Sequence, residues 1–175
     1  LTHGALAEMR TLLLELRPAV LAQADLADLM RQLAEAASGR TGIPVEVNVE
    51  GRCELSEEIR IALYRIAQEA LHNVVKHAHA TRIQVRLHCR PLPAGTGASQ
   101  AVELVISDNG VGFDPAQTPP DHLGLQILAE RAAAAGARLE ISSRPGAGTQ
   151  VRTVWPATAV ESFPESAGDM TAVPV

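Results

Sequence analysis

The chain has 175 residues, which suits one domain with short appendages, and 46% of them are hydrophobic, which is ample for a packed core. Aromatic residues make up only 2% and the net charge is −5, which argues against base stacking or a broad basic surface for nucleic acid. No apolar run reaches membrane-spanning length and no signal peptide is visible, which predicts a cytoplasmic chain and leaves membrane anchoring of a longer parent open. Cys53 and Cys89 lack C-x-x-C spacing, so we expect reduced thiols rather than a disulfide or a metal site.

The first two predicted elements are amphipathic helices. Residues 5–17 place leucine and methionine at helical spacing, and Pro18 ends the pattern because it lacks an amide donor and restricts the residue before it. The chain starts without Met inside this pattern, which suggests a fragment of a longer protein. The leucine stripe fits ordinary packing as well as it fits half of a helical hairpin or dimer interface. A second helix is predicted over residues 21–37.

Strands alternate with two further helices in the rest of the chain. Alternation of apolar and polar residues predicts half-buried strands, and a mostly apolar run predicts a strand buried on both sides. The predicted elements are, in chain order, strand 44–50, helix 57–79, strands 82–88 and 102–106, helix 124–135, and strands 139–142 and 150–155. Two strand pairs look like hairpins, which predicts a mixed sheet with helices on one face, an α/β two-layer sandwich. Residues 157–175 lack a pattern and are predicted to form a disordered tail.

The chemically distinctive stretch is I-A-Q-E-A-L-H-N-V-V-K-H-A, in the predicted central helix. Glu69, Asn73 and His77 are spaced four residues apart, so their side chains share one helix edge. Asn73 is a poor helix former beside an apolar stripe, and its side-chain oxygen is a ligand type that Mg²⁺ accepts. Glu69 could take a proton from an attacking group, while Lys76 and His77 could neutralise phosphate oxygens. A solvated helix face and compensation of the helix dipole are the alternatives.

A second candidate stretch, V-I-S-D-N-G-V-G-F-D, places Asp108 at the end of a predicted buried strand. A carboxylate there can accept a hydrogen bond from an exocyclic amine. Gly110 and Gly112 follow it, and glycines let the backbone approach a flat ligand closely. The D-N-G sequence is also a common hairpin turn, and this alternative stays open.

Two later glycine stretches are candidates for phosphate contacts. H-L-G-L-Q-I-L puts Gly124 at the start of a helix, where free amides and the helix dipole favour phosphate. R-P-G-A-G-T places Gly146, Gly148 and Thr149 between two predicted strands. A plain helix N-terminus and a plain hairpin loop are the alternatives. The chain has neither the P-loop pattern nor the dinucleotide fingerprint.

Each signal is common by itself, but their order is specific. Q-E-A-L-x-N-V-V-K-H-A, D-N-G-V-G-F-D, H-L-G-L and P-G-A-G-T together resemble the ATP-binding domain of sensor histidine kinases, the HATPase_c or Bergerat-fold (GHKL) ATPases. A-E-M-R-T-L-L-L-E-L-R-P resembles the end of the second dimerisation helix in the subfamily of nitrate and lipid-fluidity sensors (HisKA_3 type). I-A-L-Y-R-I-A-Q-E-A-L resembles the entry of that subfamily into its N box. The resemblance implies a Bergerat fold, with the dimerisation helix ending in 1–18, a catalytic ATP-binding domain over 19–156 and the tail over 157–175.

The resemblance implies ATP and Mg²⁺ as ligands and assigns the phosphate end of the site. Asn73 would coordinate Mg²⁺, which bridges the phosphates. Glu69 would act as the general base or polarise an attacking histidine. Contacts to the phosphates would come from Lys76, His77, Gly124 and Leu125. Phosphoryl transfer depends mainly on positioning and charge neutralisation, so this division of roles is physically reasonable.

The same resemblance assigns the other end of the site to adenine. Asp108 would bind the adenine amino group, and Gly110 and Gly112 would shape the adenine pocket. Thr149 would line the adenine side, and residues 115–123 would form the ATP lid.

The resemblance also implies an enzyme, a protein-histidine kinase, with a response regulator as partner. The intact parent would be a homodimer through its dimerisation helices and would move the γ-phosphoryl group of ATP to a histidine, then to an aspartate of the regulator. The E-L-H-D-type phosphoacceptor motif is absent and His3 lacks its context, so the fragment, monomeric or dimeric, is expected to bind nucleotide without autophosphorylating. Lid glycines are sparse, and Ile127 and Leu128 replace the more usual Gly-Met. The alternatives are another ATPase or anti-sigma-type serine kinase of this fold, and a degenerate dimerisation or phosphatase module.

Overall fold

The computed structural model describes residues 23–95, 97–115, 123–163 and 173–174. The predicted end of a dimerisation helix over 1–18 therefore lies outside the described residues, as does the predicted lid apart from its two ends. None of the helices in the described part of the chain combines the length and apolar character needed to cross a membrane.

The centre of the fold is a six-stranded sheet in the order β1-β2-β3-β5-β4-β6. β1 runs parallel to β2, and every other neighbouring pair is antiparallel. β2 and β3 form one hairpin and β4 and β5 form the other, so the predicted mixed sheet is confirmed. The strands are β1 (Val45–Glu50), β2 (Ile83–Pro91), β3 (Gln100–Asp108), β4 (Arg138–Ser143), β5 (Thr149–Trp155) and the short β6 (Val173–Pro174).

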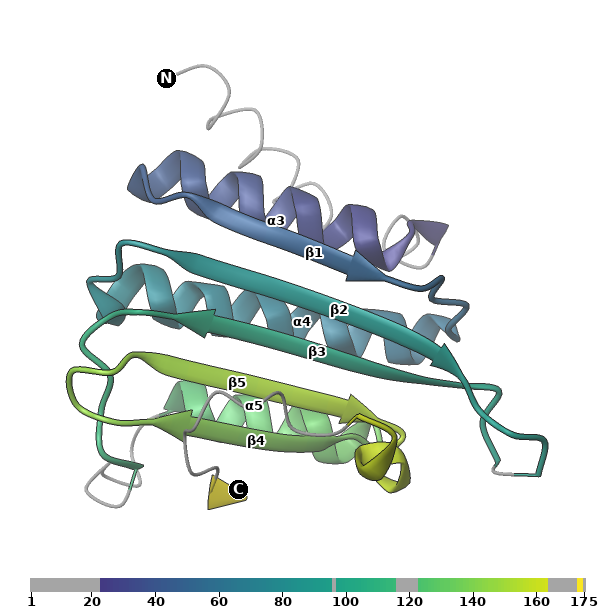
Figure 1. Cartoon of the computed structure of the whole chain (residues 1–175). Coiled ribbons are helices and arrows are strands. Elements are labelled where there is room, and N and C mark those ends of the chain that lie inside the picture. The colour runs from purple at the N-terminus through teal and green to yellow at the C-terminus, as the bar shows by residue number, and fades with distance from the viewer. Residues whose placement is uncertain (1–22, 96, 116–122, 164–172, 175) are drawn as a thin grey trace.

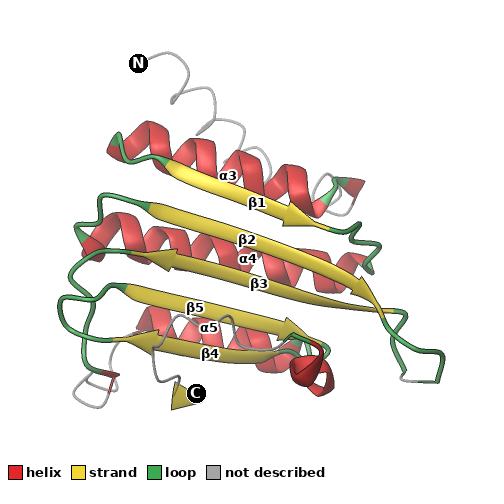
Figure 2. Ribbon diagram, viewed as in Figure 1, coloured by secondary structure: helices red, strands yellow, loops and turns green. Residues whose placement is uncertain are grey.

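The long helices cover one face of this sheet, and the short segment after β5 packs on the other, which we call the open face because it lacks a helix layer (Figure 1, Figure 2). This arrangement confirms the predicted α/β two-layer sandwich. The helical elements that build the layer are α3 (Leu26–Thr41), α4 (Glu57–Asn73), its continuation η1 (Val74–Ala78) and α5 (Leu123–Ala134). α4 lies between α3 and α5 behind the central strands, so its side chains reach both neighbouring helices (Figure 1).

The apolar faces of the helices and of the strands pack against each other in one core. α4 contributes Leu63 and Ile66, which are fully buried, and β3 contributes Leu104 and Ile106 from its helix-facing side. Burying each such side chain stabilises the fold by roughly 1.5–3 kcal/mol. On β1 the alternation is visible directly, since each valine is half-buried and each residue between them is exposed. The core thus fixes which edge of α4 remains free for chemistry.

The first described helix starts and ends later than the sequence predicts. α3 begins after Asp25, whose side chain accepts a hydrogen bond from the Ala27 amide at 2.7 Å, and this cap sets the start. It ends at Gly42, whose φ of 71° is the left-handed conformation that glycine adopts easily. The predicted helix, 21–37, therefore lies several residues before the observed one. The apolar pattern continues on both sides of Asp25 and did not mark the start of the helix.

The expectation of reduced cysteines is wrong in this structure, where Cys53 and Cys89 form a disulfide with their Cα atoms 5.3 Å apart. The loop after β1 folds back onto β2, so two residues separated by 36 positions meet. Gly51 allows this approach, because with φ at 80° it lies so close to the Cys89 carbonyl that a Cβ atom would overlap it. The side chain of Gln100 also holds this loop, through bonds to Glu54 N and the Arg52 carbonyl.

The prediction of a disordered tail from residue 157 is also wrong for its first part. Ala157–Ser162 form a short 3₁₀ helix, η3, and the following Phe163 is only 3% exposed. Phe163 packs with Ala101 and Val154 on the sheet face away from the helices. Its carbonyl accepts a hydrogen bond from Arg152 Nη2 at 2.7 Å. One aromatic anchor and one buried arginine therefore order this segment.

Candidate functional site

A cavity of about 570 Å³ opens between α4–η1, the start of α5 and the ends of β3 and β5. It is large enough for a drug-sized ligand. All but one of the ten site residues predicted from the sequence line it. The lining residues among them are Glu69, Asn73, Lys76, His77, Asp108, Gly112, Gly124, Leu125 and Thr149, and only Gly110 does not line it.

The helix edge predicted from four-residue spacing faces the beginning of α5. A Cβ atom on Gly124 would lie 2.9 Å from Glu69 Oε1 and 3.1 Å from Asn73 Oδ1, so glycine allows this close approach of the two helices. Asn73 Nδ2 is buried and makes no hydrogen bond within the described part of the chain. An unpartnered buried polar group costs about 1–3 kcal/mol, which a polar ligand in the cavity could recover.

α4 does not continue to His79 as one regular helix. From Val74 the chain widens into the π-helical turn η1, which ends at His79 with φ at 48°. Lys76 and His77 lie on this turn, are exposed and line the cavity. π-Helical turns are rare and are often found at functional sites. The Ala78 carbonyl at the end of the turn accepts a hydrogen bond from the Val111 amide at 2.7 Å, which ties the turn to the loop after β3.

Asp108 ends β3, as predicted, and is 8% exposed. Its carboxylate accepts hydrogen bonds from the Gly110 amide at 2.7 Å and from the Thr149 backbone. Burial raises the pKa of Asp108 above its ordinary value, although both backbone hydrogen bonds act in the opposite direction. Among the described residues Asp108 has no ion-pair partner, so its remaining lone pairs are available to a donor in the cavity.

Three glycines bring the backbone segments around Asp108 together. Gly110 lies against the Ala78 carbonyl and Gly148 against the Asp108 carbonyl, so a Cβ atom on either would overlap backbone. Gly112, with φ at 58°, lies against the Arg144 carbonyl in the same way. Gly110 therefore acts on the site through backbone packing, while Gly112 both packs and lines the cavity.

Two polar side chains that the sequence patterns did not indicate, Asn109 and Ser143, hold the site together. Asn109 Oδ1 accepts the amides of Thr81 and Arg82, each at 2.9 Å, and its Nδ2 donates to Thr81 Oγ1 at 2.9 Å. Ser143 Oγ accepts the Phe113 amide at 2.9 Å. Asn109 stands inside the D-N-G motif, so the motif itself was a signal that could have indicated it. Ser143 stands six residues before Thr149, where the hairpin register pairs the two.

His72, one position before Asn73, is exposed and also lines the cavity. Within the described residues no group of three or more His, Cys, Asp or Glu side chains could hold a metal ion. A divalent cation here would therefore need oxygen atoms of a bound ligand besides Asn73. This is the way in which Mg²⁺ is commonly held with substrate phosphates.

Residues 58–159 match the family described as histidine kinase-, DNA gyrase B- and HSP90-like ATPases, which covers more than half of the chain. The chain belongs to this ATPase family. The matched range runs from the first turn of α4 into η3, so it contains the whole cavity. The resemblance to sensor histidine kinases is confirmed by the relatives.

An uncharacterized sensor-like histidine kinase of Chloroflexus aurantiacus is 38% identical over 152 residues, which are 82% of this chain and 24% of the relative. The nitrate/nitrite sensor protein NarQ of Escherichia coli is 32% identical over 150 residues, which are 85% of this chain and 25% of NarQ. This agrees with the predicted nitrate-sensor type. The chain thus spans about a quarter of the length of these two relatives.

The solved ATP binding domain of PrrB from Mycobacterium tuberculosis shares the fold, with a TM-score of 0.57 and 24% identity. The match covers 74% of this chain and 91% of that domain. The ATPase family, the relatives and the fold therefore agree on the same kind of domain.

Proposed function

We propose that this chain is the catalytic ATP-binding domain of a two-component sensor histidine kinase. The single observation that carries the proposal is the cavity, which gathers a buried carboxylate without a cation at one end and an unpartnered amide beside a glutamate at the other. The family of the chain supplies the nucleotide class, and the relatives supply the kinase class.

The Asp108 end of the cavity suits the base of ATP. Asp108 accepts two backbone hydrogen bonds and can accept one more from an exocyclic amine, which adenine presents. Val111, an exposed hydrophobic residue at 51%, lines the same region and offers apolar surface to a flat ring. Gly112 and Thr149 complete this end, where backbone approaches the ligand closely.

The other end of the cavity suits the phosphates and Mg²⁺. Bound Mg²⁺ would neutralise phosphate charge and orient the γ-phosphoryl group. Asn73 would hold the ion through Oδ1, because its side-chain amide lines the cavity and lies close to Gly124, and the oxygen is the atom of that amide that Mg²⁺ accepts. Lys76 and His77 on η1 would contact phosphate oxygens, and Gly124 and Leu125 would cover them from the start of α5.

Glu69 lies one helical turn before Asn73 and next to Gly124, so it reaches the phosphate end of the cavity. There it would accept a proton from the attacking histidine or orient its ring. The acceptor histidine would come from a dimerisation helix of the intact homodimer, and the phosphoryl group would pass on to an aspartate of a response regulator. The site would thus act in the cytoplasm, where the regulator is found.

Calorimetry with AMPPNP and Mg²⁺ tests the binding part of the proposal on this chain. We expect saturable binding for the wild type, and a weaker, less magnesium-dependent isotherm for Asn73→Ala. Asn48→Ala is a matched control, because Asn48 is exposed on the edge strand β1 and does not line the cavity. An absence of heat and of any thermal shift in the wild type would favour a degenerate module instead.

Phosphoryl transfer is tested in the intact parent protein with radioactive ATP. Glu69→Gln should keep AMPPNP affinity near the wild-type value and lower the rate of acid-labile labelling by about 10²–10⁴-fold. Acid-stable label on serine in the target protein would instead favour an anti-sigma-type kinase. Acid-labile label on this chain alone would contradict an acceptor outside it.

A further inference from the structure

The disulfide between Cys53 and Cys89 takes no part in the cavity, because neither cysteine lines it. Cys89 continues the row of buried β2 side chains that starts at Ile83. Ile83 pairs with Asp108, so Cys89 lies at the end of the strand away from the cavity. Cys53 lies in the loop that joins β1 to α4. The bridge is therefore a feature that the proposed ATP site does not use.

The bridge fastens the end of an edge strand. β1 lies at the edge of the sheet and pairs with β2, and the last pair of this ladder is Glu50 with His88. The disulfide follows shortly after this pair and joins the chain beyond β1 covalently to β2. The same loop is also held by exposed hydrogen bonds from the Gln100 side chain to Glu54 N and the Arg52 carbonyl. Exposed hydrogen bonds compete with water, so the covalent bond dominates among these links.

The two sulfur atoms of the bridge differ in their access to solvent. Cys89 is 4% exposed, and its side chain belongs to the apolar core. Cys53 is half-buried, and its neighbours Arg52 and Glu54 in the loop are exposed. Access helps to decide which sulfur of a disulfide is attacked. A thiolate from solution therefore reaches Cys53 Sγ, while the core covers Cys89 Sγ.

We propose that Cys53 and Cys89 form a reversible redox site, which exchanges with small-molecule thiols and disulfides and releases the β1 edge when it is reduced. In reduction, a thiolate attacks Cys53 Sγ, the Sγ–Sγ bond breaks, and Cys89 leaves as a thiolate that takes a proton from water. A second thiolate attacks the small-molecule sulfur of the mixed disulfide and displaces Cys53, which is protonated in turn. The protein gains two electrons, and the two small thiols lose them as they become a disulfide.

Reduction frees the loop that leads into α4. Residues 42–44 join α3 to β1, and α3 packs against α4, so α3 and β1 together form one edge of the domain. α4 begins just after the loop and carries Glu69 and Asn73 towards its other end. The redox state of the bridge thus sets how firmly the α3–β1 edge is joined to the central sheet. The inference goes beyond the proposed function and does not require nucleotide binding.

Reduction of this chain by dithiothreitol, at urea concentrations below the unfolding transition, tests direct exchange. A thiol-reactive dye should find no thiol after treatment with glutathione disulfide, and both cysteines after reduction. The rate of reduction should not depend on urea, because attack at Cys53 needs no unfolding. A rate that follows the unfolding equilibrium would overturn the proposal, since the bridge would then be purely structural. Thiols that stay free after the oxidising treatment would overturn it as well.

Single variants test which sulfur is accessible, and each is the matched control for the other. In glutathione disulfide, Cys89→Ser should gain the mass of one glutathione on Cys53. Cys53→Ser should stay unmodified, because its remaining thiol on Cys89 is buried. The reverse pattern would overturn the proposed attack at Cys53. If either variant does not fold, the urea series on the wild type still decides the question.

Hydrogen exchange of the oxidised and reduced wild type tests the release of the edge. Reduction should speed exchange by about tenfold or more in β1 and residues 51–55, and leave β3 and β5 unchanged, as expected for a local opening. No change in β1, or equal changes in all strands, would overturn the release. AMPPNP calorimetry on both forms keeps the two proposals apart. A chain that exchanges thiols but binds no nucleotide would overturn the proposed function and leave the redox site standing.

Discussion

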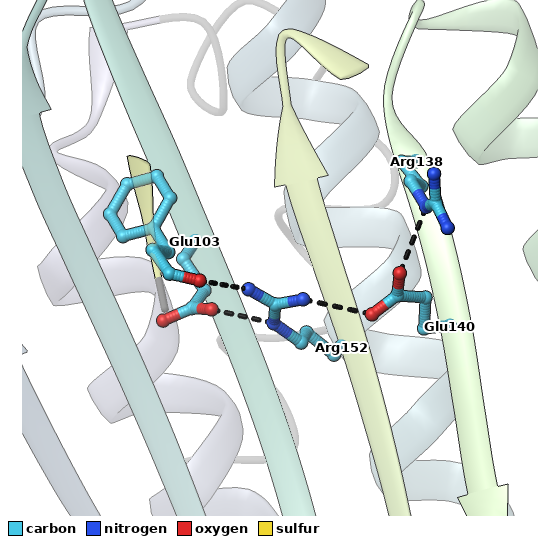
Figure 3. A network of polar contacts seen from close by, with 5 residues as sticks. Glu103, Arg138, Glu140 and Arg152 are labelled. Atoms are coloured by element: carbon cyan, nitrogen blue, oxygen red, sulfur yellow. Dashed lines mark hydrogen bonds and ion pairs between the residues drawn. The ribbon is translucent and has the colours of Figure 1, made fainter. Parts of the chain in front are cut away.

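Carboxylates on the two faces of the sheet have opposite electrostatic surroundings. β3 carries Asp108 on the helix-covered face and Glu103 on the open face, and β4 carries Glu140 on the open face. Asp108 is buried without a cation, and its pKa is raised by that burial. Glu103 and Glu140 flank the guanidinium of Arg152 (Figure 3). A carboxylate on one face therefore lacks the cation that stabilises the carboxylates on the other.

The open face shows how a buried charge is made stable. Arg152 Nε lies 2.6 Å from Glu103 Oε1, and Arg152 Nη1 lies 2.8 Å from Glu140 Oε2. Arg138 adds a second cation to Glu140 at 2.8 Å, and Phe163 supplies its carbonyl. Burial alone would lower the pKa of Arg152, but its hydrogen bonds to the two glutamates outweigh that effect and raise it. Each of the three nitrogen atoms of this guanidinium therefore donates to an acceptor.

On the helix-covered face, the polar groups that line the cavity are not fully hydrogen-bonded. Asp108 accepts hydrogen bonds only from backbone amides. Asn73 Nδ2, across the cavity, donates no hydrogen bond within the described residues. Both groups are costly in the ligand-free protein and become favourable only when a polar ligand arrives. The contrast suggests a rule that can be tested: buried polar groups without hydrogen-bond partners, rather than burial alone, distinguish the face that lines the proposed ATP site.

Among the variants that test this contrast, Arg152→Ala should have the largest effect on stability. It leaves the buried Glu140 and the half-buried Glu103 without their shared cation, and breaking such a pair costs about 3–5 kcal/mol of unfolding free energy. Urea unfolding measures the loss. Arg138→Ala is the matched control, because the Arg138 side chain is 49% exposed and its removal should cost less than about 1 kcal/mol. Equal losses in the two variants would show that the buried network is not what holds this face.

Asp108→Asn should change binding and stability in opposite directions. The variant keeps the shape of the side chain but loses a charged acceptor, which lowers AMPPNP affinity by about 1.5–3 kcal/mol. It also removes an uncompensated buried charge, so the free energy of unfolding at neutral pH should rise. Calorimetry and urea unfolding on the same sample check both signs.

Glu103→Gln on the open face supplies the comparison for Asp108→Asn. It replaces a carboxylate that pairs with Arg152, so it should lower stability and leave AMPPNP affinity unchanged. If both substitutions moved stability in the same direction, the two carboxylates would not differ in the way that we describe.

The sequence predicted the helix-covered face better than the open one. Glu69, Asn73 and Asp108 were found because each stands in a local pattern, either four-residue helical spacing or a strand end followed by glycine. The helices and strands followed from periodicity for the same reason. Local spacing did not reveal that α4 widens into a π-helical turn, whose Ala78 carbonyl accepts a hydrogen bond from the distant Val111 amide.

Long-range pairing explains what the sequence could not show. Arg152 lies 49 residues from Glu103, and nothing in the strand patterns indicates that their charges are buried together. That burial depends on Phe163, which lies in a segment predicted to be disordered. Cys53 and Cys89 likewise meet only through the fold. The roles assigned to the individual site residues stay predictions until binding is measured.

Asn109→Ala tests the support of the helix-covered face. Asn109 makes three hydrogen bonds to Thr81 and Arg82, partly exposed to water, so the variant should lose about 1–2 kcal/mol of stability. AMPPNP affinity should fall as well, because the loop that carries Asp108 and Gly110 loses its anchor. Asn48→Ala, on exposed β1, should change neither quantity. A stability loss with unchanged affinity would separate this anchor from the site.

The pH dependence of stability gives the smallest effect and the most direct view of Asp108. Its folded pKa lies above the unfolded value, so the folded protein binds a proton where the unfolded chain does not. The penalty for burying the charge is therefore fully present above the folded pKa and disappears as the pH falls towards the unfolded pKa. The stability advantage of Asp108→Asn should shrink over that window by less than about 1.4 kcal/mol for each pH unit. Urea unfolding of both proteins across that range measures the difference. An advantage that stayed constant with pH would show that the Asp108 carboxylate carries no burial penalty, and the two faces would then not differ electrostatically.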